Sequence, residues 1–132
     1  MILVDTDIWI DFFSGAEPGA QAVATLLTQR RAALSAITVF ELFCGATTPG
    51  QVEQLERLIS AVHPIALTHE AARRAAAFYV QLKRRGQLIG NQDLMLAATA
   101  MELGTAVVTM NRAHFERIDG LEILSPRQVL SA

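Results

Sequence analysis

The sequence predicts an α/β protein in which helices cover both faces of a central parallel sheet. Short apolar runs rich in branched residues, typical of buried strands, alternate with longer segments whose apolar residues recur at helical spacing. Strands that alternate with helices form parallel sheets, because each helix returns the chain to the end from which the next strand starts. The 132 residues contain no long linker, low-complexity stretch or internal repeat, so we expect one domain over residues 1–132.

Composition and charge narrow the class of protein. Apolar residues make up 52% of the chain and charged residues 18%, which is apolar for a small domain and favours a surface partly covered by a partner. No apolar run approaches the roughly 20 residues that a membrane span needs. The first residues have no basic segment and include two aspartates, so no signal peptide is expected. A single cysteine rules out an intrachain disulfide and favours a cytoplasmic location.

In the first half of the chain each element has its own signal. The run Ile2-Leu3-Val4 is typical of a strand that is buried on both faces. Ser14-Gly15 and Pro18-Gly19 separate two helical patterns, because glycine favours helix ends and proline favours helix starts. Thr38 has the hydroxyl of a helix N-cap. The expected elements are strands at 2–5 and 32–35 and helices at 8–14, 18–29, from 38 onward and across 52–59.

The second half continues the alternation. Thr68 and Asn91 precede helical patterns and are expected to cap them, and Gly86 and Gly104 follow the same patterns. Pro64 lies within an apolar run and places that strand at an edge of the sheet, because proline has no N–H to donate. The expected elements are strands at 62–67, 106–109 and 122–124 and helices at 68–85, 92–103 and from 126 onward.

Acidic residues stand where predicted strands end or predicted helices begin. Asp5 ends the first strand, Glu41 is expected three residues into the helix capped by Thr38, and Asp93 is expected in the first turn of its helix. The helix dipole explains one such acid without any function. Three of them are harder to explain in this way, because parallel strand ends meet at one edge, where ligands bind. These carboxylates are therefore candidates for a shared site.

A site with three carboxylates needs a cation, because the three cannot all stay ionised together without one. The chain has no cysteine pair and no histidines at ligand spacing, so the ligands would be oxygen atoms. Oxygen ligands favour Mg²⁺ or Mn²⁺ over zinc. Asp7 is expected to be a solvated N-cap outside the site. Cys44 is expected to be a small core residue, because no group that would activate its thiol is evident.

Four motifs resemble those of the PIN-domain ribonucleases, and in particular the VapC-type toxins of bacterial toxin–antitoxin pairs. They occur in the family's order over essentially the whole chain, and the combination is specific although each motif alone is weak. The motifs are Val4-Asp5-Thr6, Thr38-Val39-Phe40-Glu41-Leu42, the segment 89–100 (Ile-Gly-Asn-Gln-Asp-Leu-Met-Leu-Ala-Ala-Thr-Ala), and Val107 to Phe115 with Gly120-Leu121 beyond it.

This resemblance implies a small three-layer α/β/α sandwich with a central parallel sheet and a Mg²⁺-dependent endoribonuclease site. It also implies a cognate VapB-type antitoxin and self-association as a homodimer. Asp5, Glu41 and Asp93 match the family's three acidic positions, which implies that they are catalytic and hold the metal. Thr6 and Thr38 match a small hydroxyl position near these acids.

The last motif departs from the family pattern. A fourth acid is common there, and this chain has Asn111 and His114 instead. Asn111 could hold a metal-bound water or a phosphate oxygen. The second metal position is therefore left open, and a site with one resident ion is retained. Arg112 lies within this motif and, with His114, is a candidate for contact with RNA.

Two other functions stay open from the sequence. Asp5-Thr6-Asp7 after a strand also resembles the start of haloacid-dehalogenase phosphatases, and an acidic strand-end cluster occurs in receiver domains. Both need a lysine at a strand end, whereas the single lysine, Lys83, lies in an expected long helix. The second alternative is a PIN-like binding module whose metal site has decayed at the fourth position. The three retained acids argue against it.

Overall fold

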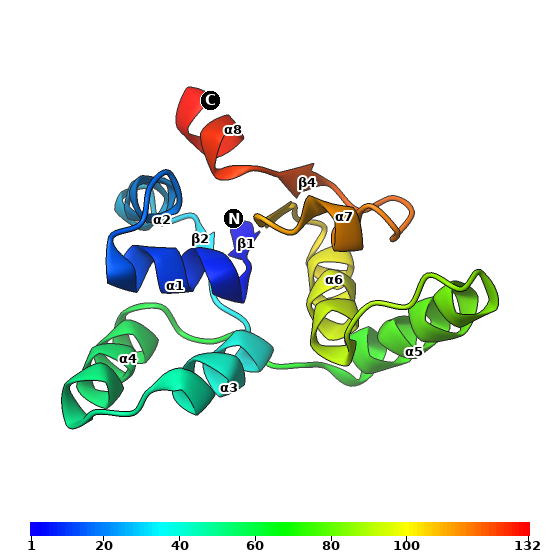
Figure 1. The fold of residues 1–132 in the computed structure, drawn as a ribbon, viewed down its shortest axis with the longest axis horizontal. Helices are drawn as coiled ribbons and strands as arrows, with labels where there is room; N and C mark the ends of the chain where they lie inside the picture. Colours follow the sequence, from blue (N-terminus) through cyan, green and yellow to red (C-terminus); the bar gives the residue numbers. More distant parts are fainter.

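A four-stranded parallel sheet forms the centre of the computed structural model, which describes residues 1–132 (Figure 1). The strand order is β2-β1-β3-β4, and every neighbouring pair is parallel. The strands are β1 (Ile2–Val4), β2 (Ala32–Ala33), β3 (Val107–Val108) and β4 (Ile123–Leu124). The helices are α1 (Thr6–Ser14), α2 (Gly19–Thr28), α3 (Ala36–Gly45), α4 (Pro49–Ala61), α5 (His69–Arg84), α6 (Asn91–Leu103), α7 (Arg112–Phe115) and α8 (Pro126–Ser131).

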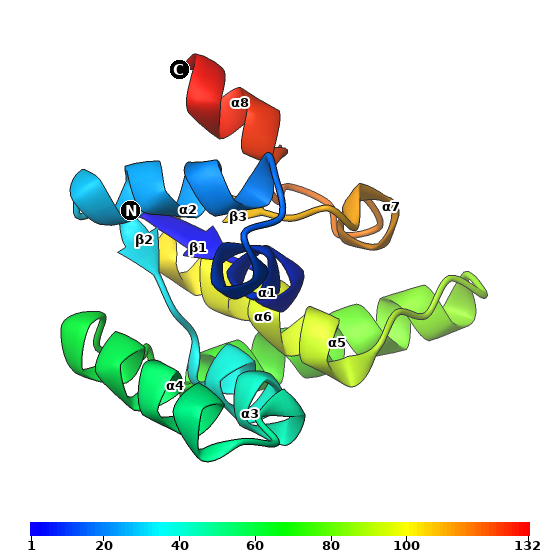
Figure 2. The ribbon, with the colours of Figure 1, turned by 60° about the vertical axis from the view of Figure 1, so that its left-hand side comes forward.

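Each face of the sheet has its own apolar core, because successive strand residues point to opposite faces. Leu3 and Val107 pack with α5 and α6 on one face. Val4 and Val108 pack with α1, α2 and α4 on the other. Figures 1 and 2 show α6 and α2 on opposite sides of β1. The predicted α/β/α sandwich with a parallel sheet is therefore confirmed.

The registers of the sheet bring the ends of β1 and β3 side by side. Leu3 pairs with Val107 and Val4 with Val108. The residue after each strand, Asp5 or Thr109, therefore lies at the same carboxyl edge, and the amide of Asp5 donates to the carbonyl of Val108 at 3.0 Å. Two central strands thus deliver a carboxylate and a hydroxyl to one place.

Two predicted helix N-caps are wrong, one by three residues and the other by one residue. Ser35, and not Thr38, caps α3: its side chain accepts the amide of Thr38 at 3.0 Å. Gly90, and not Asn91, is the N-cap of α6, and it has an extended backbone. The shift in α3 matters for the site, because it leaves the Thr38 side chain fully buried with its hydroxyl free for other partners.

The predicted strand at 62–67 is reduced to a single bridge between Ser35 and Ile65. The amide of Ile65 donates to Leu34 at 2.7 Å, and its carbonyl accepts from Ala36 at 2.8 Å. Pro64 has no N–H to continue such a ladder on its own side. Helix α7 was not predicted, because four residues are too few to display a helical period.

Some apolar side chains remain at the surface. Phe40 is 61% exposed, and Cys44, one turn further along α3, is also exposed. The prediction that Cys44 is a core residue is therefore wrong, because residues four apart share a helix face and this face of α3 points away from the core. No helix combines the length and the apolar character that crossing a bilayer requires.

Candidate active site

Asp5 is almost completely buried at the carboxyl edge of the sheet, with 7% of its surface exposed. One carboxylate oxygen, Oδ1, accepts the amide of Thr6 at 2.8 Å, so that Asp5 also caps α1. The other, Oδ2, accepts the hydroxyl of Thr109 at 2.6 Å. Both oxygens therefore have a donor from the protein, and their orientation is fixed.

Glu41 is held by the side chain of Thr6, whose backbone amide contacts Asp5. The hydroxyl of Thr6 donates to Oε1 of Glu41 at 2.8 Å and shares a 3.0 Å hydrogen bond with the hydroxyl of Thr38. A hydroxyl has one proton, and a carboxylate only accepts, so the proton between the two threonines comes from Thr38. Glu41 is in the second turn of α3 and not near its start as predicted, because α3 begins at Ala36. A helix-dipole explanation for this acid is correspondingly weaker.

Asp93 lies in the first turn of α6, as predicted. Its Oδ2 is 3.0 Å from Nδ1 of His114, and the same ring nitrogen is 2.8 Å from Nδ2 of Asn111. Nδ1 donates to Asp93 when it carries the ring proton and accepts from Nδ2 of Asn111 when it does not, so the tautomer decides which of the two contacts is a hydrogen bond. The two residues that replace a fourth acid are thus in contact with one of the three acids.

One network of hydrogen bonds and polar contacts connects the three predicted acids. The amide of Asn111 donates to the hydroxyl of Thr109 at 2.9 Å, which joins the Asp93 side of the network to the Asp5 side. The network runs in the order Glu41, Thr6, Asp5, Thr109, Asn111, His114 and Asp93. Every predicted site residue except Arg112 belongs to it or, like Thr38, donates to it.

Arg112 is engaged elsewhere. Its Nε donates to Glu116 at 2.9 Å and its Nη1 donates to the carbonyl of Ile123 at 3.3 Å. About half of its side chain remains exposed. Lys83, which a phosphatase or receiver site would need at a strand end, lies on α5 with its ammonium over the ring of Tyr79.

Two neighbouring acids at this edge, Asp5 and Asp7, have raised pKa values, mainly because they are buried. Burial, followed by the neighbouring charge of Asp7, raises the pKa of Asp5 from its ordinary value of 3.8 to about 7, with Asp93 a smaller cause in the same direction. The hydrogen bonds from Thr109 and Thr6 act in the opposite direction. Burial is also the main cause that raises the pKa of Asp7. The site thus holds more negative charge than its own donors offset.

Asp7 is half-buried and is not an N-cap, which corrects the sequence prediction. It is the second residue of α1, after the N-cap Asp5. Its Oδ2 accepts the amide of Met110 at 3.3 Å, and its Oδ1 is buried without a partner. Thr109 was also missed, although a hydroxyl residue directly after a strand is the same kind of signal as Asp5.

The chemistry of the donors fits Mg²⁺ or Mn²⁺. The candidate ligands are carboxylate oxygens, which hard divalent cations prefer. The raised pKa of Asp5 and the unpartnered Oδ1 of Asp7 both mark negative charge that a cation would offset. As the side chains stand, no three acidic, histidine or cysteine residues form a metal site. Glu41 and Asp93 are instead turned onto Thr6 and His114.

A pocket of about 330 Å³ borders the site between α1, α3 and α4. Glu41 lines it together with apolar side chains that include Ile10, Phe13 and Leu55. The pocket therefore continues from a candidate catalytic carboxylate onto an apolar surface.

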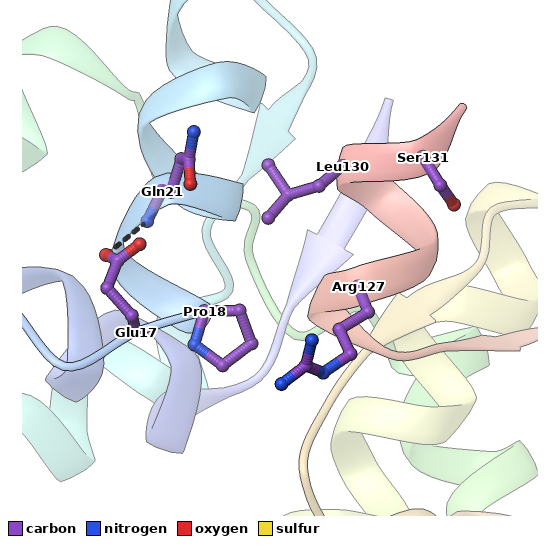
Figure 3. A pocket seen from close by; sticks show the side chains of 6 residues that line it. All are labelled: Glu17, Pro18, Gln21, Arg127, Leu130 and Ser131. Atoms are coloured by element: carbon purple, nitrogen blue, oxygen red, sulfur yellow. Dashed lines mark hydrogen bonds between the residues drawn. The ribbon is translucent and has the colours of Figure 1, made fainter.

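A second pocket, of about 450 Å³, lies between the start of α2 and α8 and contains none of the predicted site residues. Figure 3 shows Arg127 extending from α8 toward Pro18. Nearby, Glu17 accepts the amide of Gln21 at 3.1 Å.

Comparisons with known proteins agree with this arrangement. Residues 2–121 match the family model of the PIN domain. Ribonuclease VapC1 of Methanocaldococcus jannaschii is 32% identical over 127 residues, which cover 92% of this chain and 85% of that protein. The tRNA(fMet)-specific endonuclease VapC of Shigella flexneri is 29% identical over 123 residues, which cover 90% of this chain and 92% of that protein.

The fold also occurs in solved structures. A chain in a toxin–antitoxin complex from Klebsiella pneumoniae superposes with a TM-score of 0.76 and 27% sequence identity. The superposition covers 96% of this chain and 98% of that chain.

Proposed function

This chain belongs to the PIN domain family, and to the VapC ribonucleases within it, and we propose that it is a metal-dependent endoribonuclease that acts as the toxin of a toxin–antitoxin pair. The observation that carries this proposal is the network of hydrogen bonds and polar contacts that joins Asp5, Glu41 and Asp93 at the carboxyl edge of β1 and β3. Its excess negative charge supports the binding of a cation.

Asp5, Glu41 and Asp93 would hold a Mg²⁺ ion, and Mn²⁺ has the same preference for oxygen ligands. When bound, such an ion lowers the pKa of a coordinated water and offsets charge on a phosphodiester. The surrounding residues keep these carboxylates at the same edge of the sheet, and Glu41 and Asp93 would turn from their present partners to reach the ion. Thr6 contacts Glu41, Thr109 fixes Asp5, and His114 contacts Asp93. Asn111 extends the polar edge on which a phosphate oxygen would lie.

RNA binding in this proposal uses local cationic or polar groups, because the net charge of the chain is −2. His114 is in the network, and its ring is partly exposed. Arg112 is close in sequence and exposed, and its ion pair with Glu116 is of the surface kind that is readily exchanged for another anion. We infer that these two residues contact the RNA backbone.

Protein partners in this proposal are an antitoxin and a second copy of the chain. Ile10 on α1 is 52% exposed and lines the pocket that Glu41 also lines, and Phe40, the residue before Glu41 on α3, is 61% exposed. Exposed apolar side chains favour protein contacts. An antitoxin on this surface would lie next to the carboxylates, and its binding would inhibit cleavage.

Cleavage of a labelled RNA by the purified chain, with Mg²⁺ or with EDTA, tests the proposal. We expect cleavage only with the ion, and we expect Asp5→Asn and Asp93→Asn to reduce it at least a hundredfold. Asp119→Asn is a matched control, because Asp119 is an exposed surface acid. Cleavage that persists in Asp5→Asn would reject the assignment. A wild-type chain that binds RNA or an antitoxin without cleaving would support the binding-module alternative.

A further inference from the structure

We propose that Asp7 is a positioning residue that holds the loop after β3, residues 109–111, against the first turn of α1. The loop and Asp7 are distant in sequence, and they meet through the hydrogen bond from the amide of Met110 to Oδ2 of Asp7 at 3.3 Å. In this role Asp7 acts on the site through the loop and not through the substrate.

The loop is attached to α1 at two points. Thr109 donates to Asp5, and Met110 donates to Asp7. Asp5 and Asp7 belong to one rigid turn, because the carbonyl of Asp5 accepts the amides of Ile8 and Trp9 at 3.1 and 3.2 Å. Two contacts with a rigid turn fix both the position and the orientation of a short loop. With a single contact the loop could pivot about it.

The orientation of this loop determines which groups face the other carboxylates. Asn111 donates its amide to Thr109, and its side chain contacts His114, which contacts Asp93. A pivot at Met110 would therefore disturb the contacts on Asp5 and on Asp93 together. Asp7 thus supports both halves of the network from outside it.

The contact with Met110 is the hydrogen bond that links the Asp7 side chain to a distant part of the chain. Its Oδ1 is buried without a hydrogen-bond partner, which is costly for a carboxylate. What the loop needs from position 7 is an acceptor oxygen at the right place. An asparagine has such an oxygen and lacks the charge. The role proposed here therefore predicts that asparagine can replace Asp7 and that alanine cannot.

Hydrogen exchange of the Met110 amide, followed by NMR, tests the attachment directly. We expect Asp7→Ala to accelerate this exchange about tenfold or more, the effect of losing a hydrogen bond to a charged acceptor. Asp7→Asn keeps a neutral acceptor, whose hydrogen bond is weaker than that of a carboxylate, and should accelerate the exchange clearly less than Asp7→Ala does. Asp11→Ala is the matched control, because Asp11 lies one turn further along α1 and packs against Gly19 instead of the loop. Exchange of the Leu3 amide in β1 reports on the fold as a whole.

The catalytic consequence rests on the proposed function and is measured as RNA cleavage. We expect Asp7→Ala to lower kcat about tenfold with little change in KM, and Asp7→Asn to restore it. Unchanged Met110 exchange in Asp7→Ala would overturn the proposal. So would Asp7→Asn behaving like Asp7→Ala, or faster exchange without loss of kcat. If the exchange of the Leu3 amide also accelerates in Asp7→Ala, Asp7→Ser, whose hydroxyl is too short to reach the loop, takes its place.

A wild type that does not cleave RNA contradicts the proposed function, whereas the exchange of the Met110 amide still decides whether Asp7 holds the loop.

Discussion

The hydroxyl of Thr109 donates its proton to Oδ2 of Asp5 across 2.6 Å, between residues 104 positions apart in the chain. The direction of this bond is fixed, because the Thr109 oxygen accepts the amide of Asn111 and the Asp5 carboxylate has no proton to give when ionised. The bond favours the ionised form of Asp5 and lowers its pKa, against the larger effect of burial. Thr109 therefore helps to keep Asp5 charged at neutral pH.

Replacing Thr109 by valine, which has the same shape without the hydroxyl, should raise the pKa of Asp5 further. We expect the acid limb of the pH–rate profile for RNA cleavage to move to higher pH, so that activity falls more at pH 7 than at pH 9. Thr99→Val is the control, because Thr99 is equally buried but donates to a carbonyl of its own helix. An acid limb that stays in place would show that the Thr109 bond does not tune Asp5.

The raised pKa of Asp5 makes the stability of the metal-free protein depend on pH. The folded state binds a proton more tightly than the unfolded state, so this contribution is fully present below pH 3.8 and is lost as the pH rises toward about 7. The difference corresponds to on the order of 4 kcal/mol, at about 1.4 kcal/mol per pKa unit. Asp7, whose pKa is also raised, adds to the loss in the same direction.

Urea unfolding between pH 5 and pH 8 without divalent ions measures this effect. We expect the free energy of unfolding of the wild type to decrease over this range and that of Asp5→Asn to decrease much less. Asp119→Asn should retain the wild-type dependence, because Asp119 is exposed. Equal slopes for wild type and Asp5→Asn would contradict the assigned cause.

Mg²⁺ should reverse this loss of stability if the three acids hold the ion. A ligand that binds only the folded state, at a free concentration of a hundred times its Kd, stabilises that state by about 2.7 kcal/mol. We expect Mg²⁺ to raise the Tm at pH 8 and to raise it less at pH 5, where Asp5 is protonated. NaCl of equal ionic strength is the control for screening. A rise of the same size in Asp5→Asn would place the ion elsewhere.

Much of the fold could be predicted from the sequence, because its signals are local. Gly15 and Gly104 end α1 and α6 with left-handed backbone at φ of 78° and 65°, as a terminal glycine predicts. The segment 62–67 could not be assigned correctly in the same way. Its apolar composition is typical of a strand, but only Ser35 offers it a partner.

Asp5 and Asp93 were identifiable for a similar reason, because Asp5 follows a strand and Asp93 lies in the first turn of a helix, whereas Glu41 lies in the second turn of α3. Their connections were not identifiable. Thr109 meets Asp5, and Met110 meets Asp7, only because β1 and β3 are neighbours in the sheet although a hundred residues separate them. Asp7 was misjudged because an acid in a first helical turn is usually solvated, and the loop that covers it comes from the far end of the chain.

Asn111→Asp tests whether the fourth position of the site is open to an acid. Asn111 already contacts His114 and is joined to Thr109, so its carboxylate variant would add charge inside the network. We expect tighter binding of Mn²⁺, measured by EPR titration, because a further oxygen ligand and a further negative charge both favour the cation. Without the ion we expect lower stability at pH 8, because like charges repel.

Asn91→Asp is the matched control for this change. Asn91 is exposed at the first position of α6, two residues from Asp93 and outside the network, so the control adds the same charge near the same edge. A general electrostatic effect would raise the Mn²⁺ affinity of both variants alike. If residue 111 is a fourth ligand position, only Asn111→Asp should bind Mn²⁺ more tightly, because the loop after β3 places this residue in the network. Equal affinities for the two variants would argue against a fourth ligand position there.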